Sequence, residues 1–353
     1  MPRRPLIWAL TGSRAGDNAQ VLALAHAVAG VNDAEVVEKS LSYRALRLLP
    51  NILIPPGTAV LDAASRRRVE EGAMPDLVIG VGRRSVPVAR WIRHAAGGGP
   101  RLVWLGRPRA PLDWFDLVIT TAQYGLPRRH NVVVVDLPPA VSVAPPEDLE
   151  VWRERFSDLP APRVAVLVGG ERWPIRFDAR EAHRLGAAVN ALVGRVGGSW
   201  IVSTSPRTGV RQARALHEVL KRPGYFYYWR EGRKENPHRA LPALADAFVV
   251  TSDSASMIAE AVRSGRPVMV HRLPRSPLAP RWSARRGVLR RLAELGILSP
   301  PRDMDAFCDR LEERGLIRSL ADGVEALEPE GNSVSRESGL EEAIVRISQM
   351  LRS

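Results

Sequence analysis

The sequence predicts an α/β protein with two halves, each built on a parallel sheet. In the first half, short runs rich in Val, Ile and Leu alternate with segments of helix length. A proline-rich stretch at 137–146 breaks this pattern, and the alternation then restarts. The length of 353 residues fits two domains, since one domain takes roughly 100–200 residues.

The first half, residues 1–145, is expected to form one α/β domain. Its apolar runs predict six strands, with helices of suitable length between several of them. The expected strands are 6–10, 34–37, 77–80, 102–105, 117–120 and 132–135, and the expected helices are near 20–28, 59–71 and 86–94.

The second half is expected to have the same kind of architecture over residues 163–290, after a linker at 146–162. Asp178 is a suitable N-cap for a helix that runs to 196, where a Gly-Gly pair ends it. Residues 291–353 are predicted to be a helical tail that packs back on the first domain. The expected strands are 163–168, 200–203, 225–228, 247–251 and 267–270, and the other expected helices are near 210–220, 239–245 and 257–263.

The charge of the chain is unusual. It has 51 basic and 38 acidic residues, a formal net charge of +13, and its basic residues are almost all arginine. A GC-rich genome explains an arginine bias, and so does an anionic partner such as nucleic acid, a phosphate-bearing ligand or the anionic face of a membrane. The basic residues are scattered, and no nucleic-acid-binding motif accompanies them. We therefore expect a phosphate-bearing ligand or a membrane surface, and no nucleic acid.

The cysteine content and the apolar runs limit the class further. Cys308 is the only cysteine, which excludes a disulfide framework and a cysteine-rich metal site. No apolar run approaches the roughly 20 residues that span a bilayer. The first apolar run is too short for a secretory signal. The sequence therefore predicts a soluble protein of a reducing compartment.

A Ser- and Asp-rich turn carries the first candidate binding site. A strand ends at Thr251, hydroxyl and carboxylate side chains crowd the turn, and a helix begins near Ser254. The unpaired N–H groups of a helix N-terminus bind phosphate, and Glu260, on the first turns of that helix, could accept hydrogen bonds from a ribose diol. Helix capping by Ser254 or Ser256, with Asp253 stabilising the turn, explains the same residues equally well.

Two further turns favour a ligand site at the same edge of the second sheet. The strand that opens the second half ends in Gly169 and Gly170, which permit close approach of a phosphate to the backbone. The next strand ends in Thr204, Ser205 and Arg207, which supply hydroxyl groups and a guanidinium that can bind a diphosphate. Each turn alone is more often structural, but the carboxyl ends of parallel strands meet at one edge. Together the three turns predict a nucleotide or phosphate site.

Other segments offer supporting residues. The aromatic strand end near 225–229 is suited to stacking on a base that Asn236 could hydrogen-bond, although a buried strand explains the aromatic residues as well. In the first half, Asp17 follows the first strand and is a candidate general base, while a role as an N-cap explains it equally well. The turn 80–85, which contains Arg83, is of the same kind.

Several other chemistries find no support in the sequence. Asp303 and Asp305 have the spacing of a metal–diphosphate motif, but they follow two prolines at a helix start, where capping accounts for them. The seven histidines form no paired metal motif, and neither a nucleophile elbow nor a Walker loop is present. We therefore expect no metal and no covalently bound cofactor.

Six motifs, taken in order, resemble those of a known family. They are Trp8-Ala-Leu-Thr-Gly-x-x-x-Gly-Asp-Asn-x-Gln20, Ile79-Gly-x-Gly-Arg-x-Ser85, Leu167-Val-Gly-Gly170, Ser203-Thr-Ser-x-Arg-Thr208, Asn236-Pro237 and Thr251-x-Asp-Ser-x-Ser-Met-Ile-x-Glu260. Over roughly residues 5–275 this set is similar to the mitochondrial fission Elm family. The two α/β halves, with a Gly-Gly turn opening the second, also resemble GT-B glycosyltransferases.

The resemblance implies a GT-B-like fold, with two Rossmann-like domains whose parallel sheets face a cleft, followed by the helical tail. It also implies peripheral association with a membrane. In plants it implies an adaptor that brings a dynamin-related GTPase to the mitochondrial outer membrane, whereas bacterial members often carry a sugar-nucleotide label by analogy. The arginine-rich composition suggests a bacterial chain, in which mitochondrial fission is not the role.

Two functions from different classes follow as hypotheses. The first is a cytoplasmic, metal-independent glycosyltransferase that uses a nucleotide-diphosphate sugar and an acceptor, lipid-linked or at the inner face of the plasma membrane, with Asp17 as the base. The second is a non-catalytic, membrane-peripheral adaptor that recruits a protein partner, and a donor loop filled by side chains would favour it. A hydrolysing epimerase would need acid–base groups that the sequence does not identify. The residues expected to bind the nucleotide sugar are Gly169, Gly170, Thr204, Ser205, Arg207, Asn236, Ser252, Asp253, Ser254, Ser256 and Glu260.

Overall fold

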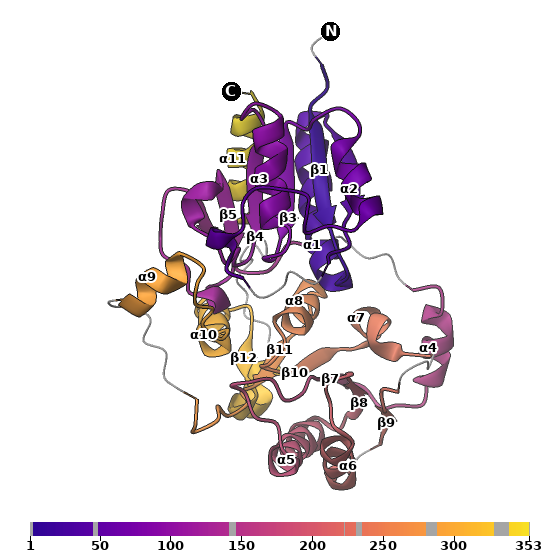
Figure 1. Ribbon diagram of the computed structural model, residues 1–353. Coiled ribbons are helices and arrows are strands. Elements are labelled where there is room, and N and C mark those ends of the chain that lie inside the picture. The colour runs from indigo at the N-terminus through magenta and orange to yellow at the C-terminus, as the bar shows by residue number, and fades with distance from the viewer. Residues whose placement is uncertain are drawn as a thin grey trace. The chain divides into compact units, whose positions relative to one another are not determined.

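The chain forms two α/β units, each with a six-stranded parallel sheet (Figure 1). Unit 1 comprises Met1–Ser142, Trp282–Arg302 and Glu337–Ser353, and unit 2 comprises Val143–Arg281 and Asp303–Arg336. The computed structural model describes residues 3–44, 49–140, 146–221, 223–230, 235–279, 288–327 and 339–352.

The sheet of unit 1 has the strand order β2-β1-β3-β4-β5-β6, and all neighbouring strands are parallel. All six strands that the sequence predicts are present. Five of them are short apolar runs that are mostly buried, whereas β2, at the edge of the sheet, is polar and partly exposed. The six strands are β1 (Leu6–Thr11), β2 (Glu35–Ser40), β3 (Leu77–Val81), β4 (Arg101–Leu105), β5 (Leu117–Thr120) and β6 (Val132–Val134).

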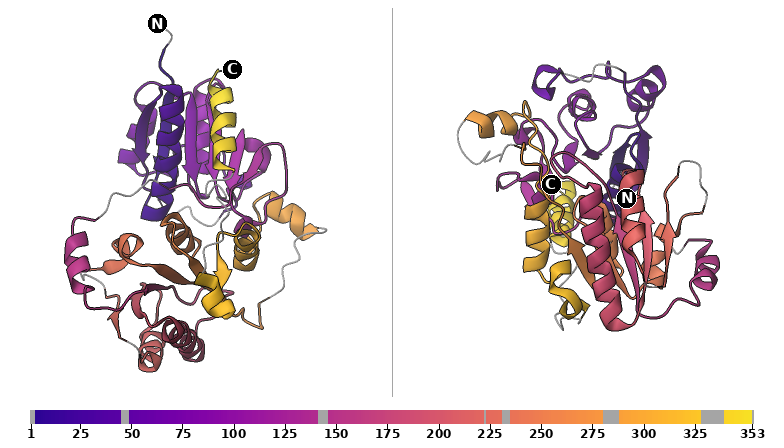
Figure 2. Two further views of the ribbon diagram at one scale, coloured as in Figure 1. Left: turned by 180° about the vertical axis from the view of Figure 1, so that it is seen from behind. Right: turned by 90° about the horizontal axis from the view of Figure 1, so that it is seen from below.

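Helices cover both faces of this sheet. Helices α2 (Ala63–Glu70) and α3 (Val86–Ala95) lie on one face, as Figure 1 shows. Helices α1 (Ala15–Asn32) and α11 (Leu340–Arg352) pack together on the other face, which Figure 2 shows from behind. Successive residues of a strand point to opposite faces, so Ile7 joins the core beneath α1 and Trp8 the core beneath α3.

The sheet of unit 2 has the order β12-β11-β10-β7-β8-β9 and is also parallel throughout. Five of its strands are those that the sequence predicts. The strands are β7 (Arg163–Val168), β8 (Ser199–Thr204), β9 (Gly224–Tyr227), β10 (Ala247–Thr251), β11 (Val268–His271) and β12 (Arg318–Ser319).

Capping positions the longest helix of unit 2 as the sequence predicts. The Asp178 carboxylate accepts the N–H of Glu181 at 2.9 Å, and Gly197, in the left-handed conformation at φ +70°, ends the helix. The helices of unit 2 are α4 (Leu149–Arg155), α5 (Ala179–Val196), α6 (Val210–Val219), α7 (Leu241–Leu244), α8 (Ala255–Arg263) and α10 (Met304–Glu313), and α9 (Val288–Glu294) belongs to unit 1.

The stretch expected to be a linker contains helix α4. Trp152 and Phe156 are four residues apart and therefore lie on one face, where both are buried. Their rings pack on Tyr225 of β9, with centroids 5.9 and 5.3 Å from the tyrosine ring. The segment 146–162 is therefore packed structure of unit 2.

The C-terminal region differs from the expected helical tail in two respects, and the first is that it contributes β12 to the sheet of unit 2 beside β11. A two-residue strand leaves no periodic pattern in the sequence. The second is that the region is divided between the units, because α10 lies in unit 2 and α11 in unit 1. Leu340, Ala343 and Ile347 of α11 join the core formed with α1.

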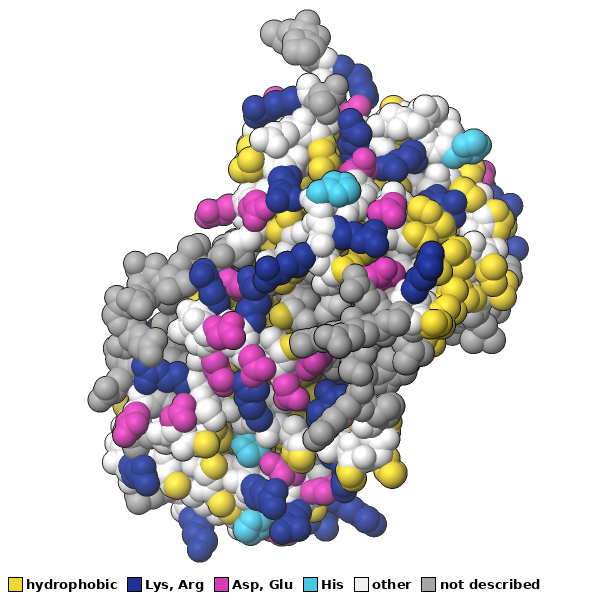
Figure 3. Space-filling view, turned by 90° about the vertical axis from the view of Figure 1, so that its left-hand side faces the viewer, with side chains coloured by type: hydrophobic (Ala, Val, Ile, Leu, Met, Phe, Trp, Pro, Cys, Tyr) yellow, Lys and Arg dark blue, Asp and Glu magenta, His cyan; other side chains and the backbone are white. Residues whose placement is uncertain are grey.

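Charged side chains of both signs lie next to one another on one side of the protein. On the face that Figure 3 draws, Lys and Arg side chains lie among Asp and Glu side chains in each unit. Among the described residues, none of the helices has the length and apolar character required for a bilayer span.

We predict that Ile347→Ala lowers the free energy of unfolding by about 2–5 kcal/mol, because it empties a fully buried site between α11 and the core of unit 1. Val345→Ala is the matched control on the same helix, since Val345 is 56% exposed and its truncation should change stability by less than about 0.5 kcal/mol. Urea denaturation followed by circular dichroism measures both. Equal losses in the two variants would contradict the packing of α11.

Candidate functional site

The three predicted turns lie side by side at the carboxyl edge of the unit 2 sheet. Strands β10, β7 and β8 are neighbours, and their registers bring their last residues level with one another. The turns that follow Thr251, Val168 and Thr204 are therefore adjacent. This is the edge at which parallel α/β sheets bind ligands.

Asp253 joins the three turns through a side chain that is fully buried, with 0% exposure. Its Oδ1 accepts the Thr251 hydroxyl at 2.7 Å. Its Oδ2 accepts the N–H of Gly170 at 3.1 Å and the Arg207 guanidinium at 2.6 Å. The Thr251 hydroxyl in turn accepts the N–H of Gly169 at 2.8 Å. A buried carboxylate requires such partners, and these partners come from all three turns.

The Gly-Gly turn packs so closely against this hydrogen-bond network that it has no room for a side chain. A Cβ atom at Gly169 would lie 2.1 Å from the Asp253 carboxylate oxygens, and one at Gly170 would lie 2.0 Å from the carbonyl oxygen of Arg207. Both N–H groups, which the sequence assigned to phosphate, donate to protein side chains. A phosphate would reach these N–H groups only by displacing Thr251 and Asp253.

The turn after β8 is held by its own hydroxyl groups. Thr204 is buried, and its hydroxyl donates to the carbonyl oxygen of Tyr227 at 3.0 Å and accepts the N–H of Trp229 at 2.8 Å. The Ser205 N–H donates to the Thr208 hydroxyl at 2.9 Å. Thr208 was not among the predicted site residues, although its hydroxyl reaches back to the carbonyl oxygens of Val168 and Gly169.

Arg207 binds a buried carboxylate, but its own side chain is partly exposed. One terminal nitrogen bonds to Asp253, yet 39% of the side chain remains exposed. A guanidinium has five N–H donors, so this bond leaves donors that face solvent. Arg207 can therefore contact an anion without losing its bond to Asp253.

The N-terminus of α8 has no side-chain cap. Ser254 occupies the N-cap position, but its hydroxyl lies 3.3 Å from that of Ser256 and accepts no N–H of the first turn. Capping by these serines is therefore not what the structure shows, whereas stabilisation of the turn by Asp253 is. The Ser252 hydroxyl accepts the N–H of Leu273 at 2.9 Å and has a structural role.

Glu260 is the exposed carboxylate of the site. Its side chain is 52% exposed, and its Oε2 lies 3.0 Å from Nε2 of His238. The Asn236 side chain accepts the backbone N–H of His238 at 3.0 Å and so caps the short 3-10 helix Pro237–Arg239 that carries this histidine. The sequence predicts Asn236 and Glu260 as site residues but not His238, whose one signal is its place directly after the Asn-Pro pair.

Asp17 lies in unit 1, whereas the other predicted site residues lie in unit 2. It is in the first turn of α1, and its Oδ2 is 3.8 Å from Nη1 of Arg14, the residue at the N-cap position. Asp17 is therefore not the N-cap. Asn18 fixes this turn instead, because its side-chain amide exchanges two hydrogen bonds with the backbone of Gly12.

Metal and thiol chemistry find no support in the described part of the chain. No group of three His, Cys, Asp or Glu side chains there is arranged to hold a metal ion. Asp303 accepts the N–H of Ala306 at 3.1 Å and caps α10, as the sequence predicts. Burial raises the pKa of Cys308 to about 12, so its thiol stays protonated at neutral pH.

Comparison with known proteins identifies the family. A family model described as mitochondrial fission ELM1 matches residues 15–337. The chain belongs to the mitochondrial fission ELM1 family. The mitochondrial fission protein ELM1 of Arabidopsis thaliana is 29% identical to this ELM1-family chain over 254 residues, which are 63% of the chain and 57% of the plant protein.

Two further proteins resemble this ELM1-family chain. The uncharacterized protein RP120 of Rickettsia prowazekii (strain Madrid E) is 20% identical over 302 residues, 75% of this chain and 82% of that protein. Among solved structures, the glycotransferase of kitacinnamycin superposes with a TM-score of 0.50 at 12% identity, covering 99% of this chain and 97% of that chain. This likeness, with a parallel six-stranded sheet in each unit, shows a GT-B-like α/β fold, as the sequence predicts.

We predict that Gly170→Ala destabilises this ELM1-family protein by about 1–3 kcal/mol, because the new methyl group would meet the Arg207 backbone. Gly30→Ala on α1 is the control, since nothing lies within 4 Å of its Cβ position and alanine favours a helix by about 0.5–1 kcal/mol. Thermal unfolding of both variants measures the difference. If Gly170→Ala is as stable as Gly30→Ala, the close contact of the turns is refuted.

Proposed function

We propose that this chain is a metal-independent glycosyltransferase that binds a nucleotide-diphosphate sugar in unit 2. One observation supports this most. Asp253 directly precedes the uncapped N-terminus of α8, and its carboxylate also binds the guanidinium of Arg207. Helix N-terminal N–H groups and guanidinium groups both bind phosphate oxygens. The GT-B-like fold is compatible with this function but does not determine it.

The residues of the edge take different roles in this proposal. Arg207 and the first turn of α8, with the exposed Ser256 hydroxyl, bind the diphosphate. Glu260, oriented by His238, accepts hydrogen bonds from the ribose hydroxyl groups. The other predicted residues position these groups, and they are Gly169, Gly170, Thr204, Ser205, Asn236, Ser252, Asp253 and Ser254.

The proposed reaction needs charge stabilisation more than acid catalysis. An acceptor hydroxyl attacks the anomeric carbon, the bond from that carbon to the diphosphate oxygen breaks, and negative charge grows on the departing nucleoside diphosphate. Arg207 and the dipole of α8 stabilise this charge. Asp17 of unit 1 is the candidate base for the acceptor proton.

The acceptor is proposed to lie at the cytoplasmic face of a membrane. The net charge of +13 supports an anionic surface or a lipid-linked acceptor, because basic proteins concentrate at anionic lipid faces.

A second candidate function is a non-catalytic adaptor that recruits a protein partner to a membrane. The observation that favours it is that Thr251 and Asp253 already occupy the N–H groups of Gly169 and Gly170. The name of the Arabidopsis relative gives a role in mitochondrial fission and no transferase activity. The two functions differ in whether the edge of unit 2 binds a nucleotide at all.

We predict that one nucleoside diphosphate, or its sugar, raises the melting temperature of the full chain. A ligand at one hundred times its dissociation constant stabilises a fold by about 2.7 kcal/mol. Glu260→Ala should remove most of this shift by deleting the ribose contact, and Arg207→Ala should remove it by deleting the diphosphate contact. Glu313→Ala, an exposed glutamate of α10, is the matched control and should keep the full shift.

The outcomes separate the two functions. A shift that Glu260→Ala loses and Glu313→Ala keeps supports the nucleotide site and names its base. No shift with any nucleotide would contradict the glycosyltransferase and leave the adaptor as the better account.

A further inference from the structure

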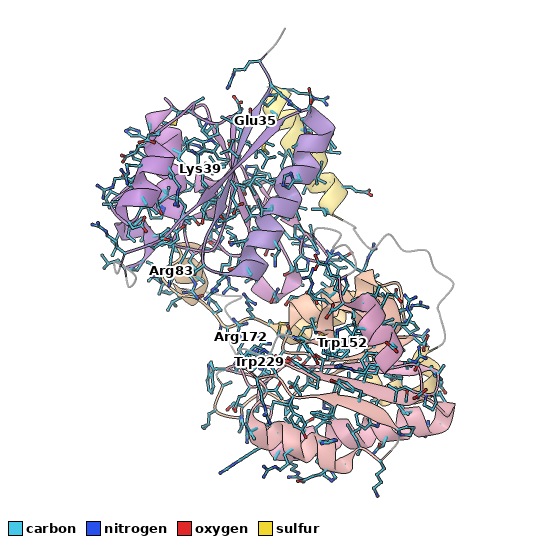
Figure 4. All side chains as sticks on the ribbon, turned by 90° about the vertical axis from the view of Figure 1, so that its right-hand side faces the viewer. Glu35, Lys39, Arg83, Trp152, Arg172 and Trp229 are labelled. Carbon is cyan, nitrogen blue, oxygen red and sulfur yellow. The ribbon has the colours of Figure 1, made fainter. Side chains whose placement is uncertain are left out.

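Arginine side chains gather at the carboxyl edge of the unit 1 sheet. Arg14 follows β1, Arg83 follows β3, and Arg107 and Arg109 follow β4. These three strands are neighbours, and their registers bring their carboxyl ends side by side. Figure 4 labels Arg83 at this end of unit 1 and Glu35, the first residue of β2, at the opposite end. The edge that binds ligands in parallel sheets therefore carries a set of cations.

A distant part of the chain adds Arg302 to the set. Its guanidinium carbon lies 5.2 Å from the centroid of the Tyr124 ring, and that of Arg107 lies 5.8 Å from the same centroid. Arg107 also donates to the carbonyl oxygens of Pro300 and Tyr124. These contacts fix the segment before Arg302 against the turns that follow β4 and β5.

The positive charge of this set is not balanced by carboxylates. Among the described residues, Asp17 is the carboxylate that pairs with the set, through Arg14, and neither Arg83, Arg109 nor Arg302 forms an ion pair. Burial lowers the pKa of Arg109, and the like charges of Arg83, Arg14 and Arg302 lower it further. Like charges held together in this way repel unless an anion binds between them.

The backbone holds Arg109 in place at a conformational cost. Arg109 adopts φ +53°, in the left-handed region that few side chains other than asparagine favour. The buried Asn51 donates to its carbonyl oxygen at 3.1 Å. Gly296 packs so closely that a Cβ there would lie 2.2 Å from the Arg109 carbonyl carbon. The surrounding structure therefore fixes an exposed cation in an uncommon conformation, which is typical of functional positions.

We propose that Arg83, Arg109 and Arg302 form a second anion site, in unit 1, that binds a phosphate or diphosphate group. Guanidinium groups bind phosphate oxygens in pairs of parallel hydrogen bonds, which suits a group with several equivalent oxygens. The residues of this site belong to unit 1, whereas those of the proposed nucleotide site belong to unit 2. If the proposed glycosyltransferase function holds, and only in that case, this site selects acceptors that carry phosphate.

The test is calorimetric titration of the full chain with inorganic pyrophosphate at low salt. In the Arg207→Ala background, which removes the proposed diphosphate contact of unit 2, each of Arg83→Gln, Arg109→Asn and Arg302→Gln should weaken binding roughly tenfold, and the triple variant should abolish it. Asparagine is used at 109 because it tolerates the left-handed conformation. Arg4→Gln is the matched control, since Arg4 precedes β1 at the opposite edge and its exposed ion pair with Asp33 contributes little to stability.

The rise in melting temperature caused by a nucleotide distinguishes this proposal from the proposed function. A triple variant that loses pyrophosphate binding in the Arg207→Ala background but keeps its nucleotide shift when Arg207 is intact supports two sites. If no nucleotide binds while pyrophosphate binding still depends on the three arginines, the proposed function fails and the anion site stands. The anion site is overturned if the triple variant binds pyrophosphate as the Arg4→Gln control does, or if Arg207→Ala alone abolishes that binding.

A second arm identifies the source of the phosphate. Co-sedimentation with phosphatidylcholine vesicles, with and without phosphatidic acid, compares the full chain with the triple variant. Binding that requires phosphatidic acid and is lost in the triple variant assigns the site to a membrane lipid. If the triple variant loses pyrophosphate binding but its vesicle binding is unchanged, the site binds a soluble phosphate ligand. If the full chain binds neither pyrophosphate nor the vesicles, the proposal is overturned.

Discussion

One buried carboxylate, Asp253, organises the candidate site of unit 2. It connects the end of β10 to the Gly-Gly turn after β7 and to Arg207 after β8. Removing one of these partners leaves a buried carboxylate with fewer hydrogen bonds, which costs about 1–3 kcal/mol. The position of Arg207 and the start of α8 both depend on this interaction, because Asp253 directly precedes the N-cap residue of α8 and its carboxylate binds the Arg207 guanidinium.

Much of the fold could be predicted because its signals are local. Most of the strands are short apolar runs that the sequence shows directly. Asp178 and Gly197 mark the ends of α5 by capping rules that involve only nearby residues. Strand β12 could not be predicted, since its two residues are ordered by pairing with β11 rather than by a pattern of their own. Helix α4 was missed because its structure depends on contacts between Trp152 and β9.

The site was predicted at the level of turns but not of individual roles. The sequence located the turns after β7, β8 and β10, since parallel strands bring them together. It assigned Gly169 and Gly170 to phosphate, although their N–H groups serve Thr251 and Asp253, because the partner of an N–H group depends on which turns are neighbours. The arginine set of unit 1 was missed for the same reason, since Arg302 reaches it from a distant part of the chain.

The most direct test of this account is a double-mutant cycle on Arg207 and Asp253. The free energies of unfolding of the full chain, Arg207→Met, Asp253→Asn and the double variant would be measured in urea. If the pair holds the three turns together, the double variant loses little more than either single variant, and the coupling energy is at least about 1.5 kcal/mol. Losses that add to within about 0.5 kcal/mol would show that Asp253 and Arg207 act independently, which contradicts the account.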